Sequence, residues 1–421
     1  MGLAFFGSIR DEYSTVMSKL RVREELPIDI ALHIIERIRE RGLEEILKLT
    51  EKYDNIKLSK DELLQKPSRG QVPGCIIESY RRLELCARSF LRNCVCRVGG
   101  FITRLDWIRG EPKSLEPVNR VGIYVPGGKY PLPSSLLMAV APARVAGVEE
   151  FVVATPPRNS DLIEWVAGYL EVDEFLRLGG VQAIAAMAYG IPEIGLEPVD
   201  MIVGPGNAYV TAAKKVISKD IPIDLIAGPS EILILAEDGV PGEVIVHDML
   251  AQAEHGPDSM SLALVTSEEF ARVLREELLK YSNESIFSSL TKRGGILYGK
   301  KEEIIRLSEI LMPEHLEIFG EFNVSKAGAI FEGIGVVYGD YGLTGANHIL
   351  PTGGTLMDRP GLSPFTFYRE FNGVYAYRQW GDLKAQAAAS NLAAQFARLE
   401  GLEYHARSAE VREKIYKNGL P

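Results

Sequence analysis

The sequence predicts an α/β fold, with two Rossmann-like, incomplete α/β domains and helical extensions at the N- and C-termini. Three observations support this class. Short apolar runs alternate with helix-length segments between residues 120 and 237, a second region of the same kind follows Ala236, and residues 1–110 and 382–417 have mostly helical spacing.

The N-terminal segment is expected to be helical because apolar residues recur at helical spacing in 29–53 and 75–94. The four cysteines lack the paired C-x2-C spacing of a zinc site; they are Cys75, Cys86, Cys94 and Cys96. We expect buried or partly buried thiols on helices, and a disulfide between helices is the alternative.

Strands and helices alternate through the middle of the chain. The expected order is a strand and turn at 120–128, a helix at 134–148, a strand at 149–157, a helix at 180–190, a strand, glycine turn and helix at 201–217, and a strand within 224–237. Strands separated by helices form parallel βαβ units, in which ligands bind at the carboxyl ends of the strands.

Three glycine turns are therefore candidates for a ligand site, at 126–128, 204–207 and 228–230. None completes the G-x-G-x-x-G pattern after a strand, so a dinucleotide site is compatible with these turns without being established by them. The alternative is that these glycines only form the turns that connect strands to helices.

The second half of the chain continues the alternation. It is expected to contain helices at 269–280 and 301–311, strands around a turn at 327–338, a loop rich in glycine and proline at 339–362, and a helical stretch at 382–417 with a break near Gly401.

Length and charge limit the class of protein. The 421 residues predict roughly two to three domains, and the formal net charge of −10 disfavours a nucleic-acid partner, because phosphate binding needs a basic surface. No apolar run reaches the length of about 18 residues that spans a membrane. The N-terminus lacks the apolar stretch of a signal peptide, so a cytoplasmic protein without membrane contact is expected.

Two short polar clusters carry the candidate chemistry, and the first is Gln252–His255. The two residues are three apart, so they share one helix face just before Gly256-Pro257 ends the helix. An amide oxygen and an imidazole there can ligate a divalent cation. A plain helix end is the alternative.

The second cluster is Glu314–His315. A carboxylate beside an imidazole can provide a general base and a group that activates water, and imidazole titrates near neutral pH. Adjacent residues do not share one helix face, so two separate roles are expected. A solvated polar pair at a loop–helix junction is the alternative.

Further polar candidates lie toward the C-terminus. Asp340 and His348 belong to the glycine-rich loop, where polar residues are more often functional than in helices. His405 follows Glu400 by five residues in the last helical stretch, where a surface histidine is the alternative. The hydrolase patterns G-x-S-x-G and H-E-x-x-H are absent.

Taken in order and approximate spacing, nine segments resemble the histidinol dehydrogenase family. They are VGIYVPGG, ARVAGV, GGVQAIAAMAYG, VGPGNAYVTAAK, IDLIAGPSE, AQAEHG, PEHLE, NHILPTGG and EGLEYHARS. The resemblance covers most of the chain from Arg120 to Arg407, whereas the first hundred residues match only as a helical pattern.

The resemblance implies a homodimer that binds one zinc ion per site and uses NAD to oxidise L-histidinol to L-histidine, the last steps of histidine biosynthesis. The oxidation would take two hydride transfers through L-histidinal. Amide and imidazole ligands suit zinc, the ion would orient the reacting carbon, and the nicotinamide would take the hydride.

The resemblance also implies residue roles. Zinc ligands would be Gln252, His255, Asp340 and, from the partner subunit, His405. His315 would take the alcohol proton, and Glu314 would activate the water that hydrates the aldehyde. Substrate contacts are implied for Ser230, Gln252, His255, His315, Asp340, His348, Glu400 and His405, and NAD contacts for Tyr124, Gln182 and Asn207.

The chain departs from the family pattern in two loops. The segment from Asp340 to His348 is one residue longer than usual, so alignment backwards from His348 puts Tyr341 where the ligand aspartate is expected. We keep Asp340 as the ligand, because a loop can absorb one residue and a phenol is a poor zinc ligand. The second departure, at 129–133, leaves the cofactor contacts of that loop open.

The expected domains are an N-terminal helical arm at 1–17, a discontinuous catalytic α/β domain at 18–125 and 230–362, a Rossmann-like NAD-binding domain at 126–229, and a helical dimerisation tail at 363–421. Three other functions stay open: a dehydrogenase of the same fold for another small alcohol, a metal-dependent hydrolase with Glu314 as its general base, and a non-enzymatic metal-binding protein.

Overall fold

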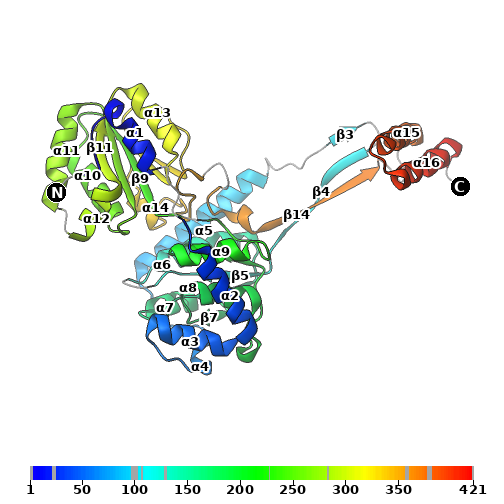
Figure 1. The fold of residues 1–421 in the computed structure, drawn as a ribbon, viewed down its shortest axis with the longest axis horizontal. Helices are drawn as coiled ribbons and strands as arrows, with labels where there is room; N and C mark the ends of the chain where they lie inside the picture. The colour runs from blue at the N-terminus through cyan, green and yellow to red at the C-terminus, as the bar shows by residue number, and fades with distance from the viewer. Residues whose placement is uncertain are drawn as a thin grey trace. The chain divides into compact units, whose positions relative to one another are not determined.

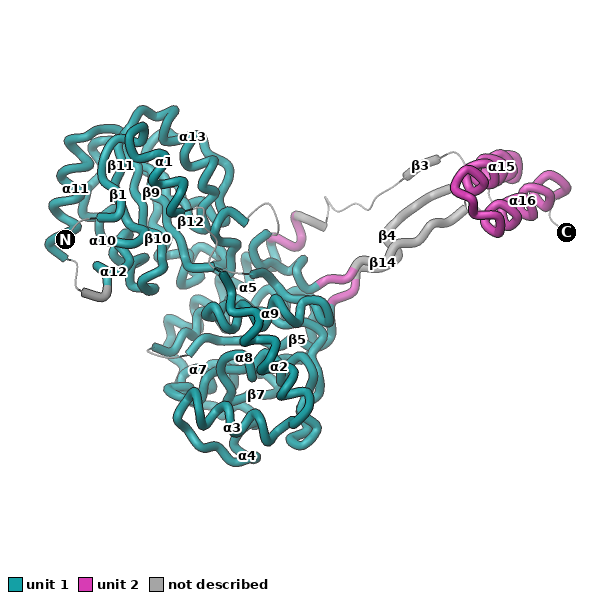
Figure 2. Tube along the Cα trace, in the orientation of Figure 1, with its two compact units in different colours: residues 1–89, 118–367 teal, residues 90–117, 368–421 magenta. Residues whose placement is uncertain are grey.

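A computed structural model describes residues 3–20, 25–95, 103–105, 108–127, 130–226, 228–281, 284–355, 360–376 and 382–419. The chain divides into two compact units, residues 1–89 with 118–367 and residues 90–117 with 368–421 (Figure 2). The first unit contains a six-stranded and a five-stranded sheet, each packed with helices (Figure 1). The α/β class expected from the sequence is confirmed.

Every strand pair of the six-stranded sheet is parallel. Its strands, in spatial order, are β1 (Phe5–Ser8), β11 (Gly294–Tyr298), β10 (Met260–Val265), β9 (Glu231–Ala236), β12 (His315–Phe319) and β13 (Ala329–Glu332). From β9 the chain adds β10 and β11 on one side and later β12 and β13 on the other. The strand order therefore reverses between β9 and β12.

Alternating side chains of this sheet face two helical layers. Ile232 and Ile234 of β9 join a core with α10–α12, whereas Leu233 and Leu235 join a core with α1 and α13. The helices are α1 (Ile9–Leu20), α10 (Gly242–Ala253), α11 (Glu268–Tyr281), α12 (Glu284–Arg293) and α13 (Lys301–Leu311). A sheet covered on both faces explains why β9 and β10 are buried along their whole length.

The five-stranded sheet has the order β2 (Leu64–Gln65), β7 (Glu174–Leu176), β6 (Glu150–Ala154), β5 (Arg120–Tyr124) and β8 (Met201–Val203). β2 is antiparallel to its neighbour, and the other pairs are parallel. The chain runs from β5 outward through β6 and β7 and then returns to β8 beside β5. The order thus reverses between β5 and β8, which makes the carboxyl ends of these strands the expected ligand position.

Small and apolar residues from α2, α3, α8 and α9 form the core on one face of this sheet. The helices of this part are α2 (Ile28–Arg41), α3 (Leu43–Asp54), α4 (Lys60–Leu63), α5 (Gly74–Val95), α6 (Pro133–Ala146), α7 (Asp161–Tyr169), α8 (Gly180–Tyr189), the 3-10 turn η1 (Pro192–Ile194) and α9 (Ala208–Ile217). Alanines of α8 are fully buried, as expected for a small-residue helix that packs closely on a sheet.

The second unit is built from an antiparallel sheet and a helical hairpin. β14 (Tyr368–Ala376) pairs with β4 (Ile108–Pro117), which pairs with β3 (Thr103–Leu105). α15 (Leu383–Leu399) and α16 (Glu403–Asn418) pack on each other through Ala394, Ala397 and Ala406. Gly401, in the left-handed region at φ +76°, makes the break expected near this position. Two short elements remain in the first unit, α14 (Val337–Asp340) and the 3-10 turn η3 (Pro364–Phe367).

The observed elements differ from the expected segments in four places. Strand β14 (Tyr368–Ala376) lies within residues 363–421, which were expected to form a helical tail. Phe5–Ser8, expected within a helical arm, form β1 beside β11. The turn at 228–230 leads into the amino end of β9, so its expected position at the carboxyl end of a strand is wrong. Helices α2 and α3 and strand β5 pack with the five-stranded sheet, although they fall in the segment expected to join residues 230–362. Pairing or packing between distant segments decides all four, and it leaves no signal in the local sequence.

The cysteines follow the expectation in part. Cys75, Cys86 and Cys94 lie on α5 as expected. Cys86 is a partly buried free thiol, but Cys75 is free and exposed because it lies in the first turn of the helix, away from the core. Cys96, and residues 128 and 129 of the loop after β5, lie outside the described residues.

Candidate active site

Glu314 and His315 lie at the amino end of β12, next to the start of β9. The backbone N–H of Glu231 donates to Glu314 Oε2 at 2.8 Å, and His315 Nδ1 lies 3.3 Å from the Glu231 carbonyl oxygen. His315 pairs in register with Ile232, so its ring projects toward α10. One residue of the neighbouring strand therefore holds both side chains through its backbone.

Both side chains are buried, with 5% of each residue exposed. Burial, opposed by the Glu231 N–H, raises the pKa of Glu314 well above its ordinary value. Burial, reinforced by the nearby His348, lowers the pKa of His315 to about 3. The alternative of a solvated polar pair is thus wrong: the structure has a neutral imidazole beside a buried carboxyl group that holds protons tightly. The two groups are 3.8 Å apart, from His315 Nδ1 to Glu314 Oε2.

Gln252 and His255 lie at the end of α10, as the Gly-Pro stop predicts. Gln252 is 5% exposed, and its amide Nε2 is buried without a hydrogen-bonding partner. An amide that is buried and unpaired costs free energy unless a ligand satisfies it. The ring of His255 is exposed, although surrounding protein atoms lower its pKa. The amide oxygen of Gln252 and the accessible imidazole of His255 can ligate a divalent metal ion, whereas the unpaired Nε2 can only donate a hydrogen bond.

Asp340 ends the short helix α14, and His348 follows it in the glycine-rich loop. Asp340 Oδ1 lies 3.8 Å from His315 Nε2, and His348 Nδ1 lies 2.9 Å from the Asp340 carbonyl oxygen. Burial raises the pKa of Asp340 to about 7 and lowers that of His348 to about 4. Tyr341 is 60% exposed. Asp340, rather than Tyr341, is therefore the residue whose side chain lies next to His315.

Helix α5 holds the segment that is one residue longer than the family pattern. Ser79 Oγ donates to the Tyr341 carbonyl at 2.5 Å, and Arg82 donates to the Leu343 carbonyl at 3.3 Å. Gly345 lies against the Cys86 sulfur so closely that a Cβ atom would overlap it. The extra residue is thus accommodated by close packing of the loop on α5, which fixes the backbone between Asp340 and His348.

The expected cofactor residues lie where the strand order reverses between β5 and β8. Tyr124 ends β5, and its hydroxyl accepts a hydrogen bond from the Gly180 N–H at 3.1 Å. Gln182 is buried in the first turn of α8. Asn207 caps α9, accepting from the backbone N–H groups of the second and third residues that follow it. These three residues follow or precede neighbouring elements of one sheet, and their contacts with NAD stay a prediction.

A buried ion pair supports the turn before Asn207. The Lys214 ammonium binds the Asp224 carboxylate and donates to the Gly204 carbonyl at 2.8 Å, while the Gly204 N–H donates to Asp224 at 2.7 Å. Gly204 has φ +111°, and a Cβ there would overlap the Tyr124 carbonyl. The backbone at this turn therefore approaches β5 closely, which only glycine allows.

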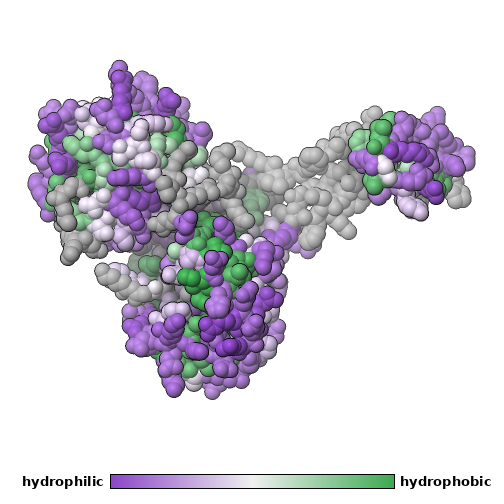
Figure 3. All heavy atoms as spheres, in the orientation of Figure 1, coloured by the Kyte–Doolittle hydropathy of each residue, from purple (hydrophilic) through white to green (hydrophobic). Residues whose placement is uncertain are grey.

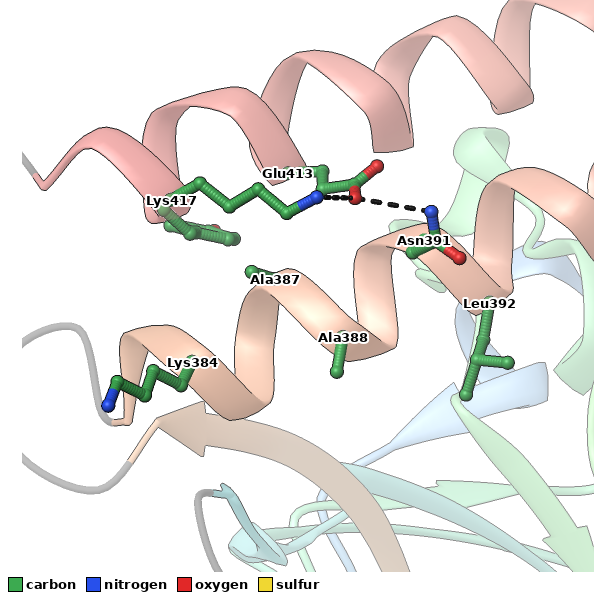
Figure 4. A pocket seen from close by; sticks show the side chains of 8 residues that line it. Lys384, Ala387, Ala388, Asn391, Leu392, Glu413 and Lys417 are labelled. Carbon is green, nitrogen blue, oxygen red and sulfur yellow. Dashed lines mark hydrogen bonds and ion pairs between the residues drawn. The ribbon is translucent and has the colours of Figure 1, made fainter.

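Glu400 and His405 lie in the second unit, between α15 and the first turn of α16, and both are exposed. Ser230 is partly buried next to β9 in the first unit. A groove between α15 and α16 is lined by Lys384, Ala387, Ala388, Asn391, Leu392, Glu413, Tyr416 and Lys417 (Figure 4). It contains none of the expected site residues, and Lys417 and Asn391 both bind Glu413 within it.

Comparison with known proteins identifies the family. Residues 22–413 match the family model described as histidinol dehydrogenase. The chain belongs to the histidinol dehydrogenase family. Curated histidinol dehydrogenases from Methanopyrus kandleri and Thermus thermophilus are 36% and 35% identical, over 94% and 91% of this chain and 95% and 94% of their own lengths. The crystal structure of histidinol dehydrogenase from Elizabethkingia anophelis is 26% identical, covers 97% of each chain and superposes with a TM-score of 0.83.

In this histidinol dehydrogenase family member, the described residues contain no group of three or more histidine, cysteine or acidic side chains that could hold a metal ion. The expected zinc ligands differ from such a group because one is the amide Gln252 and another, His405, belongs to the second unit. The described part of the chain also has no helix with the length and apolarity that crossing a membrane requires.

Two acidic residues near the site were not singled out from the sequence of this histidinol dehydrogenase. Asp248 of α10 and Glu317 of β12 face each other, and their buried carboxyl groups interact directly. Burial and the second carboxyl group raise the pKa of Glu317, so the pair holds a proton. The sequence signal that could have identified Glu317 is a charged residue inside the otherwise apolar strand segment HLEIF.

Proposed function

We propose that the enzyme oxidises L-histidinol to L-histidine through L-histidinal in two hydride transfers, with NAD and one zinc ion per site. The observation that supports this proposal most directly is the Glu314–His315 pair, a carboxyl group and a neutral imidazole held by the backbone of Glu231. Oxidation of an alcohol to an acid needs a base for the alcohol proton and a group that activates water for the aldehyde. The pair supplies one group for each requirement.

His315 takes the alcohol proton on Nε2. With Nδ1–H donating to the Glu231 carbonyl, Nε2 carries the lone pair and lies 3.8 Å from Asp340 Oδ1. Burial keeps the ring neutral, which is the form that accepts a proton. The carboxyl groups of Glu314 and Asp340 stand on either side of the ring and stabilise it once it is protonated.

Glu314 activates water for the aldehyde stage. Its Oε2 accepts from the Glu231 N–H, which leaves Oε1 for a water molecule. Because burial raises its pKa, a carboxylate at this position is a stronger base than an exposed glutamate and retains the proton that it removes.

Gln252, His255 and Asp340 would hold the zinc ion together with His405 of the partner subunit. When bound, the ion would orient the substrate for reaction. The buried amide of Gln252 and the accessible imidazole of His255, both at the end of α10, support this ligand set. Tyr124, Gln182 and Asn207 would bind NAD, which when bound accepts the hydride.

An apolar stripe on α15 supports a homodimer. Leu392, Phe396 and Leu399 are 66%, 64% and 86% exposed, and their spacing puts them on one helix face. Apolar residues gather on the surface of this helical unit (Figure 3). Exposed apolar surface of this kind is typical of an interface, and a second copy of the chain would bring Glu400 and His405 into a shared site.

The test of this function is turnover of L-histidinol with NAD and added zinc, followed by NADH absorbance. His315→Asn should lower kcat by about 10²–10⁴-fold, the usual contribution of a general base. His247→Asn is the control, because that histidine is an exposed residue of α10. Absence of NADH formation by the wild-type chain would refute the proposal.

One observation favours a second candidate, oxidation of a different small alcohol. The loop between Asp340 and His348 is one residue longer than the family pattern, and His348 is an expected substrate contact. A comparison of kcat/KM for histidinol and for amino alcohols without an imidazole separates the two candidates. A metal-dependent hydrolase would turn over without NAD.

A further inference from the structure

Asp54 is an acidic residue at the expected cofactor edge that no sequence motif singled out. It is the last residue of α3, and the left-handed Asn55, at φ +53°, ends the helix there. Its Oδ2 atom is buried and has no hydrogen-bonding partner in the described structure. Buried carboxylates are normally paired, so an unpaired oxygen calls for a donor from outside the chain.

Other buried carboxylates around this sheet do have partners. Glu164 binds Arg177 and the Ser68 N–H, and Asp224 binds Lys214. Arg158 lies close to Asp54, but its Nε atom donates to the Asp54 backbone carbonyl at 3.1 Å. That bond ties the end of α3 to the loop after β6 and leaves the side-chain oxygen Oδ2 unsatisfied.

The position of Asp54 matches the edge that carries the expected cofactor residues. The loop containing Arg158 follows the carboxyl end of β6, the neighbour of β5. Tyr124 ends β5, and the charge of Asp54 contributes, after burial, to the raised pKa of its hydroxyl. In the same region Gly127 and Gly179 both pack against Pro156, where a Cβ would come within 2.9 and 2.8 Å of its ring. The two glycines therefore let the segments after β5 and β7 pack closely on the loop after β6, which also contains Arg158.

We propose that Asp54 is a further cofactor-binding residue, whose free carboxylate oxygen accepts hydrogen bonds from a ribose of the dinucleotide. A carboxylate beside ribose hydroxyls favours the unphosphorylated ribose and repels a phosphate attached to it. Asp54 thus selects NAD over NADP. This inference rests on the proposed use of a nicotinamide dinucleotide by the same chain.

Calorimetric titration of the metal-free protein with NAD and with NADP tests the inference without turnover. Asp54→Asn and Asp54→Ala should weaken NAD binding by about tenfold or more, since each loses a charge-assisted hydrogen bond. The NAD/NADP affinity ratio should fall in both variants. Glu51→Gln is the matched control, because it removes the same charge from an exposed position one turn earlier on α3 and should leave both affinities unchanged.

The outcomes separate this inference from the proposed function. If the wild-type chain binds NAD and the Asp54 variants bind it equally tightly, or keep the wild-type NAD/NADP ratio, the role of Asp54 is refuted and the cofactor assignment stands. If the wild-type chain binds neither dinucleotide, both are refuted. Thermal unfolding of each variant checks its fold, and the near-isosteric Asn variant decides the question if the Ala variant does not fold.

Discussion

Lys214→Met removes the cation from the buried ion pair that supports the turn at Gly204. The side chains of Lys214 and Asp224 are 4% and 1% exposed, so water cannot replace the lost partner. Asp224 would keep its buried charge without the Lys214 ammonium, although the backbone N–H groups of Gly204 and Leu225 still donate to it at 2.7 and 2.6 Å. Breaking a buried pair in this way costs about 3–5 kcal/mol of folding free energy.

The double variant Lys214→Met, Asp224→Asn should recover much of this loss. The asparagine oxygen can still accept from Gly204 and Leu225, and no unpaired charge remains buried. We expect the double variant to cost about 1–2 kcal/mol, whereas each single variant breaks the buried pair and costs about 3–5 kcal/mol. The two single costs together should therefore exceed the double cost by more than about 3 kcal/mol, which is the coupling energy of the mutant cycle. Single variants should also weaken NAD binding, because both partners bind the Gly204 backbone.

Urea unfolding at neutral pH, followed by circular dichroism, measures these free energies, and calorimetry measures NAD affinity. Lys280→Met provides a matched control, since it makes the same change in an exposed pair with Glu277 and should leave the unfolding midpoint nearly unchanged. A loss for Lys214→Met below about 1 kcal/mol, or a coupling energy near zero, would refute the reasoning, because both would mean that the pair behaves as an exposed one.

Three further predictions concern the site and the assembly. Because burial raises the pKa of Glu317, the folded protein keeps a proton that the unfolded chain releases near pH 4.3, and the free energy of unfolding should fall as pH rises above that value. Urea unfolding at pH 5 and at pH 8 should show a smaller fall in this free energy for Glu317→Gln than for the wild-type chain. Equal falls in the two proteins would contradict the assignment. Gly345→Ala would overlap the Cys86 sulfur and displace the loop to His348, so zinc affinity, measured by chelator competition, should fall about 10–100-fold. Gly333→Ala, with φ +68° and open space, is its control and should bind zinc normally. Phe396→Ser should shift the protein toward monomer in sedimentation velocity, and an unchanged dimer would remove α15 from the interface.

Elements with strong local signals were predictable from the sequence. The helix expected at 301–311 has those bounds in α13, and the strand–turn–helix at 201–217 appears as β8, the Gly204 turn and α9. Apolar periodicity and glycine placement act over a few residues, so they are readable without the fold. The family motifs likewise located the polar clusters, because each motif is contiguous.

Features that depend on distant pairing were not predictable. Nothing local marks Phe5–Ser8 as a partner of β11, and the turn at 228–230 gives no sign of whether it ends a strand or begins one. Glu231 was not identified because it acts on Glu314 and His315 through its backbone, which any residue type could provide. Asp54 looks like an ordinary helix end until the fold brings it beside β5.

The most direct test of the account is product stoichiometry with L-histidinol, NAD and zinc. Quantified by absorbance and by amino-acid analysis, each histidinol consumed should give one L-histidine and two NADH, because the Glu314–His315 pair supports both oxidations in one site. A single NADH with an aldehyde as the final product would contradict the role assigned to Glu314. Consumption of histidinol without any NADH would contradict the account as a whole.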